Sequence, residues 1–267
     1  MGISKLEEQA FTAVCEAIGR NTVAIDISRG SRENPDWCTG SLVIIKRRSF
    51  IITCGHAIKP EIKNEDLRFL FRSEKGFQWT TKEEIKKLSI RILNKIKYKT
   101  FPKPIPIINR IYSNEEDDLV LLEVDQSWAE VNSNWFYKMD DLDAVAPGAD
   151  HPVYYMGFSR ELIREANVYG DIGVFPFFGV GQIINKEIDS TAFNPELHFL
   201  IDFSTSGIDE YSIDAHGLSG CGVWSRTPSG EGNLWIPNIY LVGVQHGYFR
   251  KSEVLKATKI ERVIRLI

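Results

Sequence analysis

The segment DAHGLSGCGVW, residues 214–224, places Ser219 between Gly217 and Gly220. A serine hydroxyl is a poor nucleophile at neutral pH, so Ser219 would need a base that takes its proton and a third group that orients the base. Glycines let backbone N–H groups turn toward a reacting carbonyl, and the N–H groups of Gly217 and Ser219 are the predicted oxyanion donors. Taken alone, the segment is explained better by a tight structural turn than by a nucleophile.

A histidine and an aspartate earlier in the chain change this interpretation. His56 lies at the end of the strongly β-like run FIITCGHAI, and Asp118 stands directly before the apolar run LVLLEV. An aspartate in that place becomes partly buried, where it could accept the Nδ1 proton of a histidine and leave Nε2 free as the base. His56, Asp118 and Ser219 are therefore the predicted catalytic residues, with Asp117 as the alternative to Asp118.

The elements that must position these residues read mainly as strands. The chain has 267 residues, 43% of them hydrophobic and 25% charged, which suits one large domain or two small ones. Short runs rich in Val, Ile, Leu and Thr are separated by Gly, Asn and Pro, a pattern typical of two packed antiparallel sheets or barrels. The predicted strands lie within residues 22–28, 39–58, 67–73, 118–124, 151–159, 180–185, 197–203, 221–226 and 239–249.

Three segments have helical patterns instead. Residues 1–21 and 252–267 carry apolar side chains at helical spacing, and residues 80–99 are charged and partly helical. A solvated helical insertion explains residues 80–99 better than a basic binding surface does. We expect the last helix to pack back on the rest of the chain. No internal repeat or clear linker is visible, so residues 1–267 are predicted to be a single domain.

The composition argues against several classes of protein. A formal net charge of -4 disfavours a general nucleic-acid binder. No uncharged apolar run is long enough to span a membrane, and the first residues lack the basic start and unbroken apolar stretch of a secretory signal. We therefore expect no nucleic-acid partner, no membrane partner and a cytoplasmic location.

The cysteines point to the same compartment. Cys15, Cys38, Cys54 and Cys221 lie far apart and form no CxxC pair, so reduced thiols are the simplest interpretation. A metal site built from the last three cysteines and a histidine would lack the ligand spacing of known sites. The sequence thus predicts no metal and no cofactor.

Three motifs resemble those of chymotrypsin-fold, trypsin-like serine peptidases of a divergent bacterial, intracellular type. CTGSLVII followed by FIITCGHAI is similar to the family's Gly-Ser-Leu strand and Thr-Ala-Ala-His block, DDLVLLEV to its Asp-Ile-Ala-Leu-Leu strand, and HGLSGCGVW to its Gly-Asp-Ser-Gly-Gly-Pro block. The order His56, Asp118, Ser219 is that of the chymotrypsin-type triad. The resemblance implies an all-β fold of two packed six-stranded antiparallel barrels, about residues 22–135 and about residues 136–267, with an N-terminal helix, a helical insertion and a C-terminal helix.

The resemblance implies a serine endopeptidase that cleaves protein or peptide substrates through an acyl-enzyme, by limited proteolysis of specific intracellular targets. Two departures from the family pattern stand out. Leu218 occupies the place of the aspartate that pairs with a newly cut N-terminus, so activation by that salt bridge is not expected. Cys38 matches a family half-cystine, but its partner position holds Ala57, so that disulfide is not expected either.

The primary specificity pocket is the least defined part of the resemblance. Ile213 falls where the family places the pocket floor, which would leave a basic substrate side chain without a counter-ion. His216 is expected at the pocket rim. YLVGVQHGY resembles the strand that lines the substrate channel and contributes Val244, Gln245 and His246, the last of which is either a pocket histidine or, in the favoured interpretation, a structural strand histidine.

Other interpretations remain open from the sequence. A cysteine peptidase using Cys221 is disfavoured because Ser219, and not a glycine, stands two residues before it. A catalytically silent peptidase fold that serves as a binding module would be expected to have lost a triad residue, and none is lost. His151 and His198 have no motif around them and are read as structural or surface residues. The charged start and helical end would suit attachment to other modules or subunits of a larger regulatory or defence system.

Overall fold

Strands dominate the described part of the chain. The computed structural model describes residues 5–27, 36–71, 99–100, 105–139, 148, 152–158, 177–188, 192–203, 215–226 and 239–267. The predicted insertion at residues 80–99 lies almost entirely outside these ranges. The described α-helices are α1 (Lys5–Arg20), α3 (Gln126–Val131) and α5 (Ile260–Arg265). None of them has the length and apolar character that crossing a membrane requires.

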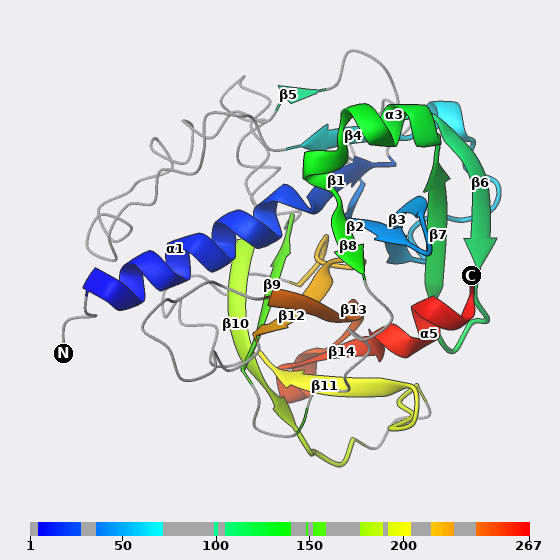
Figure 1. Ribbon diagram of the computed structural model, residues 1–267. Coiled ribbons are helices and arrows are strands. Elements are labelled where there is room, and N and C mark those ends of the chain that lie inside the picture. The colour runs from blue at the N-terminus through cyan, green and yellow to red at the C-terminus, as the bar shows by residue number, and fades with distance from the viewer. Residues whose placement is uncertain are drawn as a thin grey trace, which may run out of the picture.

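The first half of the chain forms one curled sheet (Figure 1). Its strand order is β5-β4-β1-β2-β3-β7-β6, and β8 pairs in parallel with β2. Within the described residues this sheet does not close into the six-stranded barrel that the resemblance implies. Its strands are β1 (Thr22–Asp26), β2 (Trp37–Ile45), β3 (Arg48–Cys54), β4 (Arg68–Phe71), β5 (Lys99–Thr100), β6 (Ile107–Tyr112), β7 (Leu119–Val124) and β8 (Tyr137–Met139).

The second half forms a closed six-stranded antiparallel barrel, as predicted (Figure 1). Its strand order is β10-β11-β14-β13-β12-β9. The strands are β9 (Pro152–Gly157), β10 (Phe177–Ile184), β11 (His198–Asp202), β12 (Gly222–Arg226), β13 (Ile239–Phe249) and β14 (Val254–Lys259). The predicted all-β class with two packed antiparallel halves is therefore confirmed.

The apolar runs of the sequence are buried on both faces of their strands. Successive side chains of a strand point to opposite faces, so alternate residues can enter different cores. In β7, Val120 and Leu122 pack in the core of the first half, whereas Leu119 and Leu121 pack in a second core between the halves. That second core also receives Trp224 from β12, and the barrel has a third core of its own.

The two ends of the chain pack against the core between the halves. From α1, Val14, Cys15 and Ile18 are buried there, which agrees with the predicted N-terminal helix. The C-terminal helix is shorter than predicted, because residues 254–259 form β14 and only Ile260–Arg265 is helical. The reason is tertiary: β14 pairs with both β11 and β13 and closes the barrel.

Candidate active site

His56 and Asp118 meet at the same end of two paired strands. The antiparallel register of β3 and β7 places Cys54 opposite Leu119. His56 follows Cys54 by two residues and Asp118 directly precedes Leu119, so both side chains leave the sheet at one edge. The backbone N–H of Gly55 also donates to the Asp118 carbonyl at 2.8 Å, which extends the pairing to the two loops.

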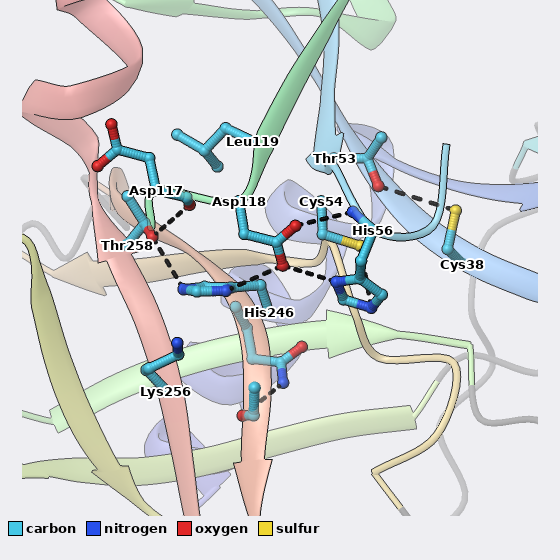
Figure 2. A network of polar contacts seen from close by, with 12 residues as sticks. Cys38, Thr53, Cys54, His56, Asp117, Asp118, Leu119, His246, Lys256 and Thr258 are labelled. Atoms are coloured by element: carbon cyan, nitrogen blue, oxygen red, sulfur yellow. Dashed lines mark hydrogen bonds and ion pairs between the residues drawn. The ribbon is translucent and has the colours of Figure 1, made fainter. Parts of the chain in front are cut away.

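The Asp118 carboxylate contacts His56 with both oxygens. Oδ1 accepts the backbone N–H of His56 at 2.7 Å, and Oδ2 lies 2.6 Å from its Nδ1 (Figure 2). Asp118 has a φ of 50°, a left-handed conformation that aspartate tolerates better than most residues. A Cβ at Gly55 would lie 3.2 Å from Oδ1, so glycine leaves room for the carboxylate.

These contacts shift the pKa values of both groups. The hydrogen bond with Asp118, followed by the contact with the Cys54 thiol, raises the pKa of His56 to about 10. Burial alone would raise the pKa of Asp118, but hydrogen bonds with His246 and His56 lower it well below its usual range. The arrangement therefore stabilises an imidazolium at His56, the form that this side chain would take after accepting a proton from a nucleophile.

The serine segment folds as two successive tight turns. Leu218 N donates to Ala215 O at 3.1 Å, and Cys221 N donates to Leu218 O at 2.9 Å. Gly217 and Gly220 are the third residues of these turns, with φ of 94° and 91°. Positive φ at the third residue is the requirement of a type II turn and favours glycine there. The serine is the second residue of the second turn.

Backbone N–H groups on either side of Leu218 have no acceptor among the described residues. They belong to Gly217 and Ser219, whereas the N–H groups of Leu218, Gly220 and Cys221 all donate to carbonyls. Unpaired donors beside a serine hydroxyl could receive the negative charge that develops on a carbonyl oxygen during nucleophilic attack. These are the two donors that the sequence predicted.

Thr39 of β2 holds the serine turns in place from the other half of the molecule. Its N–H donates to Ser219 O at 2.9 Å and its hydroxyl donates to Gly217 O at 2.8 Å. The same hydroxyl accepts the N–H of Phe158 at 3.0 Å. A Cβ at Gly220 would overlap Thr53 Oγ1 and Thr39 O, so only glycine fits against β2 and β3.

Ser219 Oγ and His56 Nε2 share no hydrogen bond among the contacts of the described residues. Instead, His56 Nε2 lies 3.8 Å from Cys54 Sγ (Figure 2). The His56 side chain is 51% exposed, so the ring has an open side toward solvent. Catalytic hydrogen bonds are often long in a resting enzyme and tighten when substrate binds. The structure thus brings His56 and Asp118 into contact and presents Ser219 without a direct bond to them.

The predicted pocket residues lie in different environments. Ile213 is outside the described residues. His216 is exposed in the first serine turn, and its role at the pocket rim stays a prediction, whereas Val244 and Gln245 are buried in β13. The His246 side chain is only 2% exposed and contacts Asp118, a position that agrees with the structural interpretation and offers almost no surface to a substrate.

The alternative residues have other partners. Asp117 forms a two-bond ion pair with Arg262 of α5, with both N–O distances at 2.8 Å, so Asp118 is the carboxylate that contacts His56. Cys221 is fully buried, and burial strongly raises the pKa of its thiol, which disfavours the thiolate that a cysteine nucleophile needs. His198 Nε2 donates to the Glu116 carbonyl oxygen over 2.9 Å, and burial lowers the pKa of His198 to about 4.

Three residues that shape the site carried no signal in the sequence. Thr39, Thr258 and Arg262 each act through contacts across the two halves, and their types are ordinary for a strand or a surface helix. Among the described residues, no group of three His, Cys, Asp or Glu side chains is placed to hold a metal ion.

A closed barrel packed on a curled antiparallel sheet, with the His–Asp pair on one half and the serine turns on the other, defines a chymotrypsin-like fold. Among similar solved structures is the serine endoprotease from Yersinia pestis, with a TM-score of 0.51 and 13% identity over 99% of this chain and 68% of that one. The protease Anisep from Arthrobacter nicotinovorans has a TM-score of 0.50 and 12% identity, and the similarity covers 91% of each chain. Identities this low show the fold alone. No protein-family model matches the chain, and a search of curated proteins gives no match.

Proposed function

We propose that the protein is a serine endopeptidase that uses His56, Asp118 and Ser219. The observation that carries this proposal is the 2.6 Å contact between His56 Nδ1 and Asp118 Oδ2, at a sheet edge that Thr39 of β2 joins to the serine turns. The His56 ring is half exposed, and among the described contacts its Nε2 meets only Cys54 Sγ, at 3.8 Å. A general base needs that combination.

The proposed mechanism begins from the neutral form of the His56 ring, which becomes more populated as the pH approaches its pKa of about 10, with proton transfer from Ser219 Oγ to His56 Nε2. Oγ then forms a bond to the carbonyl carbon of the scissile peptide, and Asp118 stabilises the imidazolium. The oxyanion lies between the N–H groups of Gly217 and Ser219. His56 returns the proton to the leaving amine as the C–N bond breaks, which leaves an acyl-enzyme that water hydrolyses with His56 again as the base.

The substrate is proposed to be a protein or peptide, because both similar solved structures named above are proteases. We also propose that the enzyme carries out limited proteolysis of specific targets. It is further proposed to be attached to other modules or subunits. A reducing, cytoplasmic setting is supported by the four cysteines, whose thiols are all free and buried. We propose that the specificity pocket includes His216, which is exposed in the first serine turn.

The proposal predicts that a fluorophosphonate probe labels the wild-type chain and that Ser219→Ala removes the label completely. A proteome-derived peptide library, digested with both proteins side by side, should give cleavage products only with the wild type. We expect a large loss of cleavage rate, because without the nucleophile only substrate binding and the oxyanion donors still contribute to catalysis. In a comparable triad, removal of the nucleophile lowers the rate by a factor of about 10⁶.

Two outcomes would contradict the proposal. Undiminished cleavage by Ser219→Ala would exclude Ser219 as the nucleophile. Absence of both labelling and cleavage in a correctly folded wild type would favour the second candidate, a catalytically silent module. That candidate has one observation in its favour, the missing bond between Ser219 Oγ and His56 Nε2 among the described contacts.

A further inference from the structure

The Asp118 carboxylate has a second imidazole partner besides His56. His246 Nδ1 lies 3.1 Å from Asp118 Oδ2, the same oxygen that contacts His56 Nδ1 (Figure 2). The two histidines differ sharply in environment, because the His56 side chain is 51% exposed and that of His246 is 2% exposed. One imidazole therefore faces solvent, and the other closes the buried side of the carboxylate.

A local irregularity of the barrel directs His246 toward Asp118. The pairing of β13 with β14 shifts register between Gln245 and Gly247, which leaves His246 as the extra residue of the bulge. Bulges re-aim single side chains and occur often beside active sites. The ring is then fixed on its other side, where Nε2 lies 2.9 Å from Thr258 Oγ1 of β14.

The contacts define where His246 carries its proton. An ionised carboxylate only accepts hydrogen bonds, so the 3.1 Å contact requires a proton on Nδ1. Burial lowers the pKa of His246, which favours the neutral ring with that single proton. The single hydroxyl proton of Thr258 then faces two acceptors, Asp117 O at 2.8 Å and the unprotonated His246 Nε2 at 2.9 Å. The other charged or titratable groups facing the ring are His56, His198 and Lys256.

We propose that His246 is a positioning residue, which donates from Nδ1 to Asp118 and fixes the carboxylate in the orientation that holds His56. A side chain of the barrel, His246, thereby aligns Asp118, which belongs to the first half of the chain. Without it, the Oδ2 atom would lose a buried donor, and the carboxylate could rotate away from the His56 ring. The catalytic consequence rests on the proposed peptidase function, whereas the structural consequence for His56 does not.

The test compares two variants of nearly equal size, His246→Asn and His246→Leu. The asparagine amide can replace Nδ1 as a donor to Asp118, and the leucine cannot. We expect His246→Leu to lower the rate of fluorophosphonate labelling of Ser219 roughly 10- to 100-fold, the cost of a misplaced catalytic group. His246→Asn should stay within a few-fold of the wild type, because the donor is restored.

An NMR titration of the His56 ring gives a readout that needs no substrate. We expect the pKa of His56 in His246→Leu to fall toward the ordinary value of about 6.5, with the wild-type value largely kept in His246→Asn. If the pKa falls in His246→Leu but no variant labels or cleaves, the positioning role stands and the peptidase proposal fails. An unchanged His56 pKa in His246→Leu, or equal effects of Leu and Asn on pKa and rate, would overturn the positioning role.

A second variant keeps the test decisive if His246→Leu does not fold. Thr258→Val keeps the shape of the side chain and removes the hydroxyl that faces His246 Nε2. The His246 ring should then be less well fixed, and the pKa of His56 should shift in the same direction by a smaller amount. A His56 titration identical to that of the wild type would count against the proposal.

Discussion

Asp117 and Asp118 are neighbours in the chain and have different partners. Asp118 turns toward His56 through a left-handed backbone conformation, whereas Asp117 is buried against Arg262. The sequence DDLVLLEV shows two equivalent carboxylates before a strand, so it could name the pair but could not choose firmly between its members. The choice depends on a backbone dihedral angle and on an arginine 145 positions away.

The pairing with Asp118 predicts an effect on the His56 titration. Asp118→Asn keeps the shape of the side chain and removes its charge, so the pKa of His56 should fall from about 10 toward its ordinary value. NMR of the His56 ring between pH 5 and 11 would measure the change. Asp117→Asn is the matched control and should leave the His56 pKa close to that of the wild type, and a larger shift there would reverse the assignment.

The raised pKa of His56 also fixes the sign of a stability change. The folded state keeps a proton on His56 up to about pH 10, whereas the unfolded state loses it near pH 6.5. The stabilisation that comes from the raised pKa of His56 is therefore complete below pH 6.5 and declines as the pH rises from there to about 10. Since the ring is half exposed, we expect this contribution to be modest and screened by salt.

The serine turns show what a glycine pattern does and does not encode. HGLSGC predicted a tight turn with free N–H groups, and each glycine does occupy a position with positive φ. The sequence could not show that Gly220 also packs so closely against Thr39 and Thr53 of the other half that a Cβ would not fit there. The turn conformation could be predicted from the residue types, but the contact of Gly220 with the first half depends on how the two halves pack.

Gly220→Ala should therefore destabilise the protein. The left-handed backbone alone costs an alanine roughly 1–2 kcal/mol, and the overlap of the new Cβ with Thr53 and Thr39 adds to this. Urea denaturation would measure the loss of unfolding free energy. Gly148→Ala is the control, because a Cβ there meets no atom of the described residues within 4 Å. Similar losses in both variants would show that the Gly220 contact has little importance.

Four strands lie outside the predicted ranges, namely β5, β6, β8 and β14, and the reason is identifiable for β6 and β14. Residues 107–112 follow a proline-rich stretch and form β6, an edge strand of the first sheet whose exposed face lacks a clear apolar pattern. Residues 254–259 have helical apolar spacing but form β14, because its neighbours in the closed barrel pair with both of its edges. The bulge at His246 belongs to the same class of feature, since it arises from strand register and carries no sequence signature.

The two halves of the molecule hold each other's candidate catalytic loops. Thr39 of the first half binds the carbonyls of Gly217 and Ser219. The second half binds the turn before β7, through Thr258 at Asp117 O and Arg262 at the Asp117 carboxylate. Figure 1 shows the red α5 beside the lower end of β7, where this ion pair forms. The site is therefore assembled by packing of the halves, which explains why its motifs are visible in the sequence and its cross-contacts are not.

Removal of the arginine should weaken this packing. Arg262→Ala leaves the Asp117 carboxylate, whose side chain is 4% exposed, without its charged partner. We expect a loss of about 2–3 kcal/mol in unfolding free energy, the range for a hydrogen-bonded charged group left unpaired. Urea denaturation would measure it. Arg265→Ala, at an exposed position of the same helix, should change stability by less than about 0.5 kcal/mol, and equal effects would contradict the ion-pair argument.

The reaction of the buried cysteines with an alkylating reagent can report where the structure opens first. Cys15 lies in the core between the halves, Cys38 in the core of the first half and Cys221 in the core of the barrel. Burial raises the pKa of each thiol, so an alkylating reagent reacts with a given cysteine only when its surroundings open. The order in which the three thiols become alkylated would therefore record whether the halves separate before either one unfolds.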